Sequence, residues 1–316
     1  MPELRAAVIG AGRLGTLHAQ KYGLIPGIKL VHTVDIDRDR AASLAAETGA
    51  APLADYRELK GKADIVTIAS PGVTHHEIAA AMLAAGIDVM LEKPMAATLG
   101  EARELARLAE QHGRILQIGH IERFNPAVVR LHSIVKNPRF VECHRLASFT
   151  ERGADVDVIL DLMVHDLDVI LSVAPSEVTS LEAVGVAILT DRIDLANARI
   201  RFKSGLIANL VTSRVSARRE RKIRFFQPDA YISVDYETRR IQIYRKNPSA
   251  PGSQFPTISA EQVDFGQSDP LADEVRAFVD SVRNRTAPTV GPLDGLRVME
   301  LTQQIKDAME TDSPAG

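Results

Sequence analysis

The chain has 316 residues, 45% of them hydrophobic, and a formal net charge of −3 at pH 7. The length indicates two domains, and the scattered charges of both signs give no reason to expect a nucleic acid or a membrane as partner. The single cysteine, Cys143, excludes an intrachain disulfide and a cysteine-based zinc site, and it is typical of a reducing compartment. No apolar stretch has membrane-spanning length, and the first residues lack a signal-peptide pattern. We therefore expect a cytoplasmic protein without a metal site.

A strand, a glycine turn and a helix open the chain. Residues 4–9 (LRAAVI) are an apolar run of strand length, the pattern GxGxxG follows at once, and helical spacing begins at residue 13. In this context the glycines permit a tight turn, a close approach of a pyrophosphate, and close packing of helix on strand. The free N–H groups at the helix start favour the phosphates. The predicted cofactor contacts here are Gly10, Gly12, Arg13, Leu14 and Gly15. An ordinary glycine-rich turn is the alternative.

Asp35 follows the second predicted strand, residues 28–34, and lies twenty positions after Gly15. A carboxylate at this place can accept hydrogen bonds from both hydroxyls of an adenosine ribose, and it would repel a 2′-phosphate. The sequence therefore favours NAD over NADP, although Arg38 could stack on the adenine or hold that phosphate. The alternative is that Asp35 only caps the next helix.

Strands and helices then alternate with short loops as far as residue 120, which predicts a parallel, doubly wound sheet. We expect helices at 38–48, 74–85 and 99–112 and strands at 63–69, 88–91 and 115–118. Ligands of such sheets bind beyond the carboxyl ends of the strands. Ser70 and His75 follow one of these strands, so we place both near the nicotinamide. For His75, hydrogen bonding to the local backbone is an equal alternative.

Glu92, Lys93 and Pro94 follow the next strand at the same edge. A lysine in such a crevice is desolvated enough to have its pKa tuned or to hold a substrate oxygen. Pro94 keeps the chain extended, so that no helix starts at Lys93. We predict Glu92 and Lys93 as cofactor contacts and Lys93 as a catalytic residue, with a surface ion pair as the alternative.

Together, GAGRLG, Asp35 and Glu92-Lys93-Pro94 resemble the glucose–fructose oxidoreductase / myo-inositol dehydrogenase (Gfo/Idh/MocA) family. The resemblance implies an NAD-binding Rossmann domain at 1–120 and a second α/β domain at 121–316. The second domain would contain a large, open, mostly antiparallel sheet whose face commonly forms the subunit contact, in a homodimer or homotetramer. Its last helix, 292–309, would pack back on the first domain. The resemblance also implies that Arg123 and Asn125, in the Arg-Phe-x-Pro segment, border the substrate.

Asp161, His165 and Asp168 have the spacing of one helix face. An imidazole between carboxylates is held in orientation and its cationic form is stabilised, as a proton acceptor requires. Carboxylates that complement the helix dipole, or a metal site, are the alternatives. The three residues match the family's catalytic pattern, but the glycine pair that usually precedes it is replaced by residues 158–160 (VIL). That replacement suggests a reshaped floor of the substrate site.

Strand patterns dominate the second half, with a hairpin turn at 203–205 and an exposed loop expected at 247–257. Six cations lie between Arg214 and Arg224, in a segment that we interpret as a hairpin loop. They are either solvated or paired with acidic residues of a neighbouring subunit. The sharper hypothesis is that one or two of these arginines, Arg214 first among them, hold the diphosphate of a nucleotide sugar.

We predict an NAD-dependent dehydrogenase that oxidises a secondary hydroxyl of a sugar. Lys93 would stabilise the charge on the reacting oxygen and His165, oriented by Asp161, would accept the proton, although the two roles could be exchanged. The segments GHIERFNPAVV, HRLASFTERGADVDVILDLMVHDLD and FFQPDAYISVDY resemble the bacterial UDP-N-acetylglucosamine 3-dehydrogenases of lipid A synthesis. This implies oxidation of the 3-hydroxyl of that sugar. The alternatives are a free polyol or inositol dehydrogenase and a dinucleotide-sensing regulator without activity.

Overall fold

The computed structural model describes residues 3–151, 153–154, 156–251 and 254–311. Their contacts divide the chain into two compact units. The first unit runs from the N-terminus to Phe124 and includes Asp269–Met299, and the second contains Asn125–Ser268 and the chain from Glu300 onward. The boundary expected at residue 120 lies four residues before Phe124, where the N-terminal part of the first unit ends. The first unit also contains residues 269–299, which were expected in the second domain.

The first unit is built on a six-stranded parallel sheet in the order β3-β2-β1-β4-β5-β6. Its strands are β1 (Leu4–Ile9), β2 (Ile28–Val34), β3 (Ala51–Leu53), β4 (Ile65–Ile68), β5 (Asp88–Glu92) and β6 (Leu116–Gly119). Every residue of β4, β5 and β6 is buried, as expected for a parallel sheet covered on both faces. The order reverses between β1 and β4, and this switch point is where doubly wound sheets bind their ligands.

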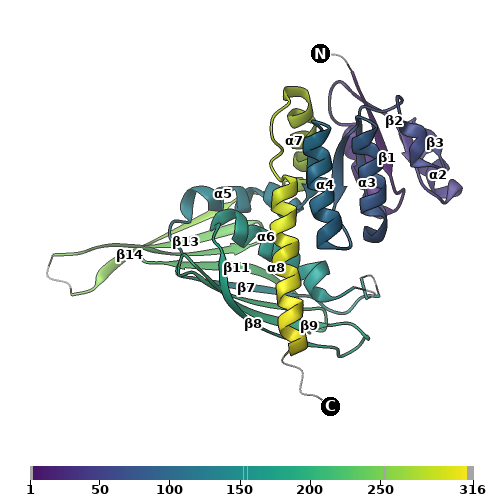
Figure 1. Ribbon diagram of the computed structural model, residues 1–316. Helices are drawn as coiled ribbons and strands as arrows, with labels where there is room; N and C mark the ends of the chain where they lie inside the picture. Colours follow the sequence, from purple (N-terminus) through teal and green to yellow (C-terminus); the bar gives the residue numbers. More distant parts are fainter. Residues whose placement is uncertain (1–2, 152, 155, 252–253, 312–316) are drawn as a thin grey trace. The chain divides into compact units, whose positions relative to one another are not determined.

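Helices cover both faces of this sheet (Figure 1). They are α1 (Arg13–Tyr22), α2 (Arg38–Thr48), α3 (His75–Ala84), α4 (Leu99–Gln111) and α7 (Pro270–Asn284), with short 3₁₀ turns η1 (Tyr56–Leu59), η2 (Gly72–Thr74) and η3 (Ile121–Phe124). Helices α3 and α4 pack in one hydrophobic cluster, whereas α1 and α7 pack in the other. Because Val275, Phe278 and Val282 of α7 enter the cluster with Tyr22 of α1, the returning segment completes the Rossmann core.

The second unit is built on an eight-stranded sheet in the order β14-β13-β12-β11-β7-β10-β9-β8. Its strands are β7 (Phe140–Leu146), β8 (Val178–Val186), β9 (Leu195–Phe202), β10 (Ile207–Ser213), β11 (Glu220–Gln227), β12 (Ala230–Asp235), β13 (Arg240–Ser249) and β14 (Pro256–Asp264). Among the described strands of this sheet, only β7 and β10 pair in parallel. The sheet is therefore mostly antiparallel, as the family resemblance implied, and the hairpin turn at 203–205 is confirmed by the β9–β10 pairing.

Two expectations for this sheet were wrong. Residues 214–224 are not a hairpin, because β7 lies between β10 and β11, so the chain crosses over β7 there. The loop expected at 247–257 is shorter, because β13 continues to Ser249 and pairs with β14 from Pro256; residues 252–253 lie outside the described part. Nearly all of β14 is exposed, so it lacks the alternating pattern that would have revealed a strand.

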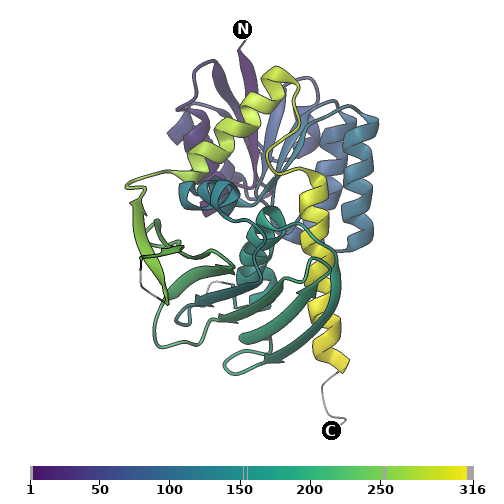
Figure 2. The same ribbon diagram turned by 90° about the vertical axis from the view of Figure 1, so that its left-hand side faces the viewer.

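One face of the second sheet packs against helices. Along β7, Val141, Cys143 and Arg145 are buried and alternate with half-buried residues on the other face. Figures 1 and 2 show α6 (Val164–Val173) over one face of this sheet, next to α5 (Pro126–Ile134). A π turn, η4 (Ile159–Met163), leads directly into α6. The last helix, α8 (Pro292–Thr311), starts in the first unit and ends in the second. None of the described helices is long and apolar enough to cross a membrane.

Candidate functional site

The glycine turn after β1 has the geometry of a dinucleotide site. Gly10 has a φ of +96°, and a Cβ there would lie 2.7 Å from the carbonyl carbon of Ala69. A Cβ on Gly15 would overlap the carbonyl oxygen of Gly10, whereas one on Gly12 would meet nothing within 4 Å. Gly10 and Gly15 are therefore required by the fold itself. The backbone at Gly12 is open, which is the place where a pyrophosphate must approach.

The start of α1 leaves its first N–H groups available for an anion. Gly12 is the N-cap, and no side chain of the described residues caps it. Arg13 at the next position is exposed and Leu14 is half-buried. An uncapped helix start with an open glycine in front of it fits the phosphates of NAD.

Asp35 lies beside this turn at the end of β2. Its carboxylate accepts hydrogen bonds from the N–H of Ala11 (2.8 Å) and the N–H of Asp37 (2.9 Å). The cap of α2 is Asp37, which accepts from the N–H groups of Asp39 and Arg40, so Asp35 is not the helix cap. Because a carboxylate has about four acceptor positions, Asp35 retains capacity for the ribose hydroxyls. The residues of this turn therefore fit NAD.

His75 joins the loops that follow β4 and β5. The side chain is buried, with Nδ1 2.7 Å from the carbonyl oxygen of Pro94 and Nε2 2.9 Å from that of Ser70. The Oγ of Ser70 lies 2.8 Å from that of Thr74. A neutral imidazole donates from one nitrogen only, so His75 hydrogen-bonds one of these two backbone carbonyls and lies against the other, between the two loops at this edge of the sheet. Its place near the nicotinamide stays a prediction.

Glu92 has a buried partner that sequence reasoning missed. Its Oε1 lies 2.7 Å from Nε2 of His18, and His18 has no exposed surface. The same carboxylate lies against Gly119, where a Cβ would come within 2.8 Å of Oε2. Glu92 therefore links α1 to the end of β5 and packs its carboxylate over Gly119 of β6, and the half-buried Lys93 follows it directly. The signal in the sequence was the position of His18 at helical spacing from Gly15 and Tyr22, both buried.

The second unit contains the other predicted catalytic residues. Asp161 lies in the π turn η4, and His165 lies in the first turn of α6; both are half-buried. Asp168 is only 1% exposed, on the buried side with Asp166. A π turn holds one more residue than an α turn, so the helix after it is rotated relative to an uninterrupted one. This turn contains Asp161 and ends before His165, whereas His165 and Asp168 are three residues apart in the regular helix α6, so the alignment of all three stays a prediction.

The two residues at the crossing between the units have local structural partners. Arg123 forms an ion pair with Asp294 (3.2 Å) within the first unit. Asn125 begins the second unit, is 4% exposed, and caps α5 by accepting from the N–H of Ala127 (3.1 Å). These contacts explain their positions in the fold, and the substrate role implied by the family resemblance remains a prediction.

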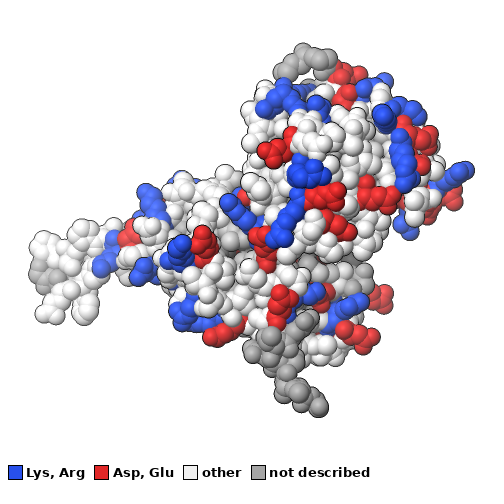
Figure 3. Space-filling model, in the orientation of Figure 1, with Lys and Arg blue, Asp and Glu red and all other residues white. Residues whose placement is uncertain are grey.

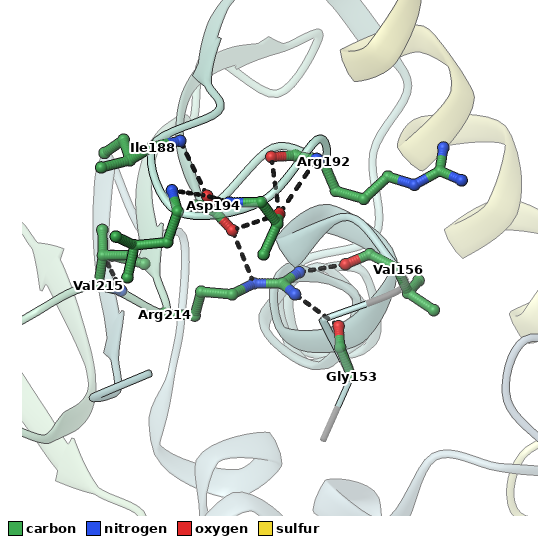
Figure 4. Close-up of polar contacts among 10 residues, drawn as sticks. Gly153, Val156, Ile188, Arg192, Asp194, Arg214 and Val215 are labelled. Carbon is green, nitrogen blue, oxygen red and sulfur yellow. Dashed lines mark hydrogen bonds and ion pairs between the residues drawn. The ribbon is translucent and has the colours of Figure 1, made fainter. Parts of the chain in front are cut away.

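Arg214 is buried, at 6% exposure, and its guanidinium is engaged on all sides (Figure 4). Nη1 and Nη2 donate to the carbonyl oxygens of Gly153 and Val156, and Nε lies 3.6 Å from Oδ1 of Asp194. These partners would compete with a substrate diphosphate for the guanidinium, and the substrate role of Arg214 stays a prediction. Sequence reasoning missed them because Asp194 and Gly153 are distant along the chain.

Asp194 is the acceptor at the centre of a loop. Its Oδ2 accepts from the N–H groups of Ile188, Leu189 and Thr190 at 2.6–2.9 Å, and Oδ1 accepts from the hydroxyl of Thr190 at 2.9 Å (Figure 4). Burial alone would raise the pKa of this carboxyl, but the hydrogen bonds to its ionised form outweigh burial and lower the pKa to about 2. Asp194 is therefore ionised at neutral pH and organises residues 188–194.

Most other cations of the 214–224 segment pair with acidic residues of the same unit. The ion pairs join Arg218 to Glu220, Arg219 to Glu237, Lys222 to Asp235, and Arg224 to both Glu142 and Glu220. On the face shown in Figure 3, basic and acidic side chains are likewise intermixed. The basic segment is therefore balanced within the chain and does not form a free cationic surface.

Cys143 is buried in β7, and burial raises the pKa of its thiol. It is therefore not an activated nucleophile. Among the described residues, no cluster of histidine, cysteine and carboxylate side chains could hold a metal ion.

Comparison with known proteins assigns both halves of the chain to one family. Residues 4–120 match the model of an oxidoreductase family with an NAD-binding Rossmann fold, and residues 127–235 match the Gfo/Idh/MocA C-terminal domain. The chain is 36% identical over 312 residues to UDP-N-acetylglucosamine 3-dehydrogenase of Acidithiobacillus ferrooxidans, covering 98% of each protein.

A solved structure of the Acidithiobacillus ferrooxidans enzyme superposes with a TM-score of 0.92 at 36% identity, covering 98% of this chain and 99% of that one. The chain is also 28% identical over 319 residues to scyllo-inositol 2-dehydrogenase (NAD(+)) of Bacillus subtilis, covering 95% of this chain and 92% of the relative.

Proposed function

Because the chain belongs to the Gfo/Idh/MocA family of NAD-binding oxidoreductases, we propose that it oxidises the 3-hydroxyl of UDP-N-acetylglucosamine to the 3-keto sugar. One observation carries this choice of substrate. The relative named for that reaction is 36% identical to the chain over nearly the full length of both proteins. The chain is an NAD-dependent dehydrogenase whichever sugar it uses, so the inactive regulator that the sequence left open is set aside.

The first unit supplies the cofactor site in this proposal. NAD, when bound, accepts the hydride that leaves the carbinol carbon. The open backbone at Gly12 and the uncapped start of α1 would hold the pyrophosphate, and Asp35 would hold the adenosine ribose. Lys93, at the carboxyl end of β5, would donate a hydrogen bond to the reacting oxygen and stabilise its developing charge.

The second unit supplies the proton acceptor. His165 would take the hydroxyl proton, and Asp161 would orient the imidazole and stabilise the imidazolium that forms. Both side chains are half-buried, as proton transfer to a bound substrate requires. Oxidation at one carbon with loss of one proton and one hydride needs no metal.

Inositol or polyol oxidation is the second candidate, and it is favoured by the full-length similarity to scyllo-inositol 2-dehydrogenase. The two candidates differ in the diphosphate, which inositol lacks. Arg214, Arg218 and Arg224 pair with acidic residues of the same unit, so a UDP diphosphate bound to this segment would compete with these ion pairs.

The proposal is tested by following NADH with UDP-N-acetylglucosamine, UDP-glucose, free N-acetylglucosamine and myo-inositol as substrates. We expect the highest kcat/KM with UDP-N-acetylglucosamine, and competition by UDP alone. Faster turnover of myo-inositol, with no inhibition by UDP at millimolar concentration, would replace this proposal by the second candidate.

The assembly and location of the enzyme are part of the proposal. We propose a homodimer or homotetramer that forms through the second sheet. Its support is a ladder of aromatic side chains on one face, with ring centroids 5.0–5.7 Å apart, formed by Phe140, Phe226, Tyr231 and Tyr244. The single cysteine supports a reducing, cytoplasmic location. The 3-keto product would supply an aminotransferase of lipid A synthesis.

A further inference from the structure

Arg214 connects two segments of the second unit that are distant in the sequence. Its side chain lies against the carboxylate of Asp194, and its backbone N–H donates to the carbonyl oxygen of the same residue at 3.0 Å. On the opposite side, two of its nitrogens donate to the carbonyl oxygens of Gly153 and Val156 (Figure 4). A guanidinium is a rigid planar fork, so these contacts together determine where the turn at Gly153 lies.

The chain from this turn leads into the helix that carries Asp161. The N–H of Val158 donates to the carbonyl oxygen of Ile193 at 3.0 Å, which is a second link to the loop around the buried carboxylate. The N–H of Asp161 donates to the carbonyl oxygen of Asp157 at 3.0 Å, and Asp157 forms an ion pair with Lys306 at 2.8 Å. The start of the π turn is thus held from three directions.

The backbone at Gly153 lies against the side chain of Asp161, one of the predicted catalytic residues. Its φ is +78°, and a Cβ added to it would lie 3.0 Å from Oδ2 and 3.5 Å from Cγ of Asp161. The carboxylate therefore lies directly against the backbone that Arg214 holds. A shift of this backbone would move the carboxylate or remove its support.

We propose that Asp194 and Arg214 are positioning residues, which hold the turn at Gly153 and thereby the carboxylate of Asp161 in the orientation that supports His165. The inference rests on the proposed catalytic roles of Asp161 and His165. Arg214 acts through the turn and does not contact the substrate. Because Asp194 stays ionised at all physiological pH values, the pair does not itself titrate in the working range.

The test is Arg214→Lys, which keeps the charge but loses the planar fork. We expect kcat to fall at least about tenfold, as is usual when a catalytic group is misplaced. NAD affinity should change less than about twofold, since the proposed NAD contacts lie in the first unit. The acidic limb of the kcat profile should move to lower pH, because a displaced Asp161 stabilises the imidazolium of His165 less. Hydrogen exchange at the N–H of Val158 should accelerate about tenfold or more.

Arg285→Lys is the matched control. Arg285 binds a buried carboxylate, Asp88 (2.7 Å), and a glycine carbonyl, Gly113 (2.6 Å), in the first unit. Because the Arg285 side chain is more exposed than that of Arg214, this variant should lower the melting temperature less, and it should not shift the pH profile of kcat. Gly153→Ala is a second variant that leaves the Arg214 side chain intact. It should reproduce the pH shift, because its Cβ would press on the Asp161 carboxylate.

Two results would overturn the inference. One is a kcat for Arg214→Lys within about twofold of wild type. The other is a loss of activity that follows the melting temperature as it does in Arg285→Lys, with unchanged exchange at Val158. Failure of the wild type to oxidise UDP-N-acetylglucosamine would count against the proposed function instead. The comparison of kcat is then made on the sugar alcohol that the wild type does oxidise, and the exchange measurement is unaffected.

Discussion

Replacing Asp194 by asparagine removes one buried charge and should change both the stability of the second unit and its dependence on pH. The carboxylate accepts four hydrogen bonds, from three backbone N–H groups and the Thr190 hydroxyl, and lies 3.6 Å from Nε of Arg214. An amide cannot serve both sides, because its NH₂ group would face either the N–H groups or the guanidinium. A hydrogen bond to a charged group contributes about 1 kcal/mol more than a neutral one, so several are weakened and the expected loss is about 2–4 kcal/mol.

The lowered pKa of Asp194, which arises from the same hydrogen bonds, gives a magnitude of similar size. The difference between an ordinary pKa of 3.8 and about 2 in the folded chain corresponds to about 2 kcal/mol. Because the folded pKa is the lower one, this stabilisation is complete above pH 4 and is lost as the pH falls through 2, with about half remaining at pH 3. The wild type should therefore become more like Asp194→Asn as the solution is acidified.

Urea unfolding followed by circular dichroism at pH 7, 5 and 3 measures this difference. We expect about 2–4 kcal/mol between wild type and Asp194→Asn at pH 7 and pH 5, and a clearly smaller difference at pH 3. Equal stabilities at pH 7, or a difference that does not shrink at pH 3, would refute the reasoning that the loop is organised by an ionised carboxylate.

Other predictions concern the first unit and the chemistry. Gly15→Ala should destabilise the fold, whereas Gly12→Ala should leave the melting temperature unchanged and weaken NAD binding, because only the Gly12 Cβ would enter open space; calorimetry and cofactor titration distinguish them. Asp35→Ser should reduce the preference for NAD over NADP by about 1–3 kcal/mol, and an unchanged preference would remove Asp35 from the cofactor site. Lys93→Ala should lower kcat at least about a hundredfold with NAD affinity kept. His165→Ala should lower kcat by a similar factor and remove its pH dependence near neutrality. Normal turnover in Lys93→Ala or in His165→Ala would contradict the catalytic role proposed for the residue replaced.

Much of the first unit follows from local patterns in the sequence. The bounds expected for β1, β2 and α2 agree with the structure, because apolar runs and helix ends marked by Asp37 and Gly49 are local signals. The three residues of β3 gave no signal, since two of them are exposed. The amphipathic pattern of α7 predicts a helix but does not say which sheet it covers. Its return to the Rossmann core therefore could not be read from the sequence.

In the candidate site, too, features set by local sequence could be predicted and features set by distant contacts could not. The strand, glycine turn and helix were predictable, because their pattern depends on residues that are neighbours in the chain or at a fixed spacing. The cofactor roles of Gly12 and Asp35 stay predictions. The partners of Glu92 and Arg214 were not predictable, because each pair closes a contact over a long sequence separation. The crossover at 214–224 was mistaken for a hairpin because the hydrophobic pattern of a strand does not indicate which other strand it pairs with. Here β7 lies between β10 and β11.

The central claim is that the chain oxidises C3 of UDP-N-acetylglucosamine with NAD. It is tested most directly with UDP-N-acetylglucosamine deuterated at C3, followed by mass analysis of the cofactor and the sugar. The account predicts that the deuterium appears in the reduced nicotinamide, that the sugar product carries a ketone at C3, and that turnover requires no added metal. Reduced cofactor without deuterium, or no reduced cofactor while an inositol is turned over under the same conditions, would contradict it.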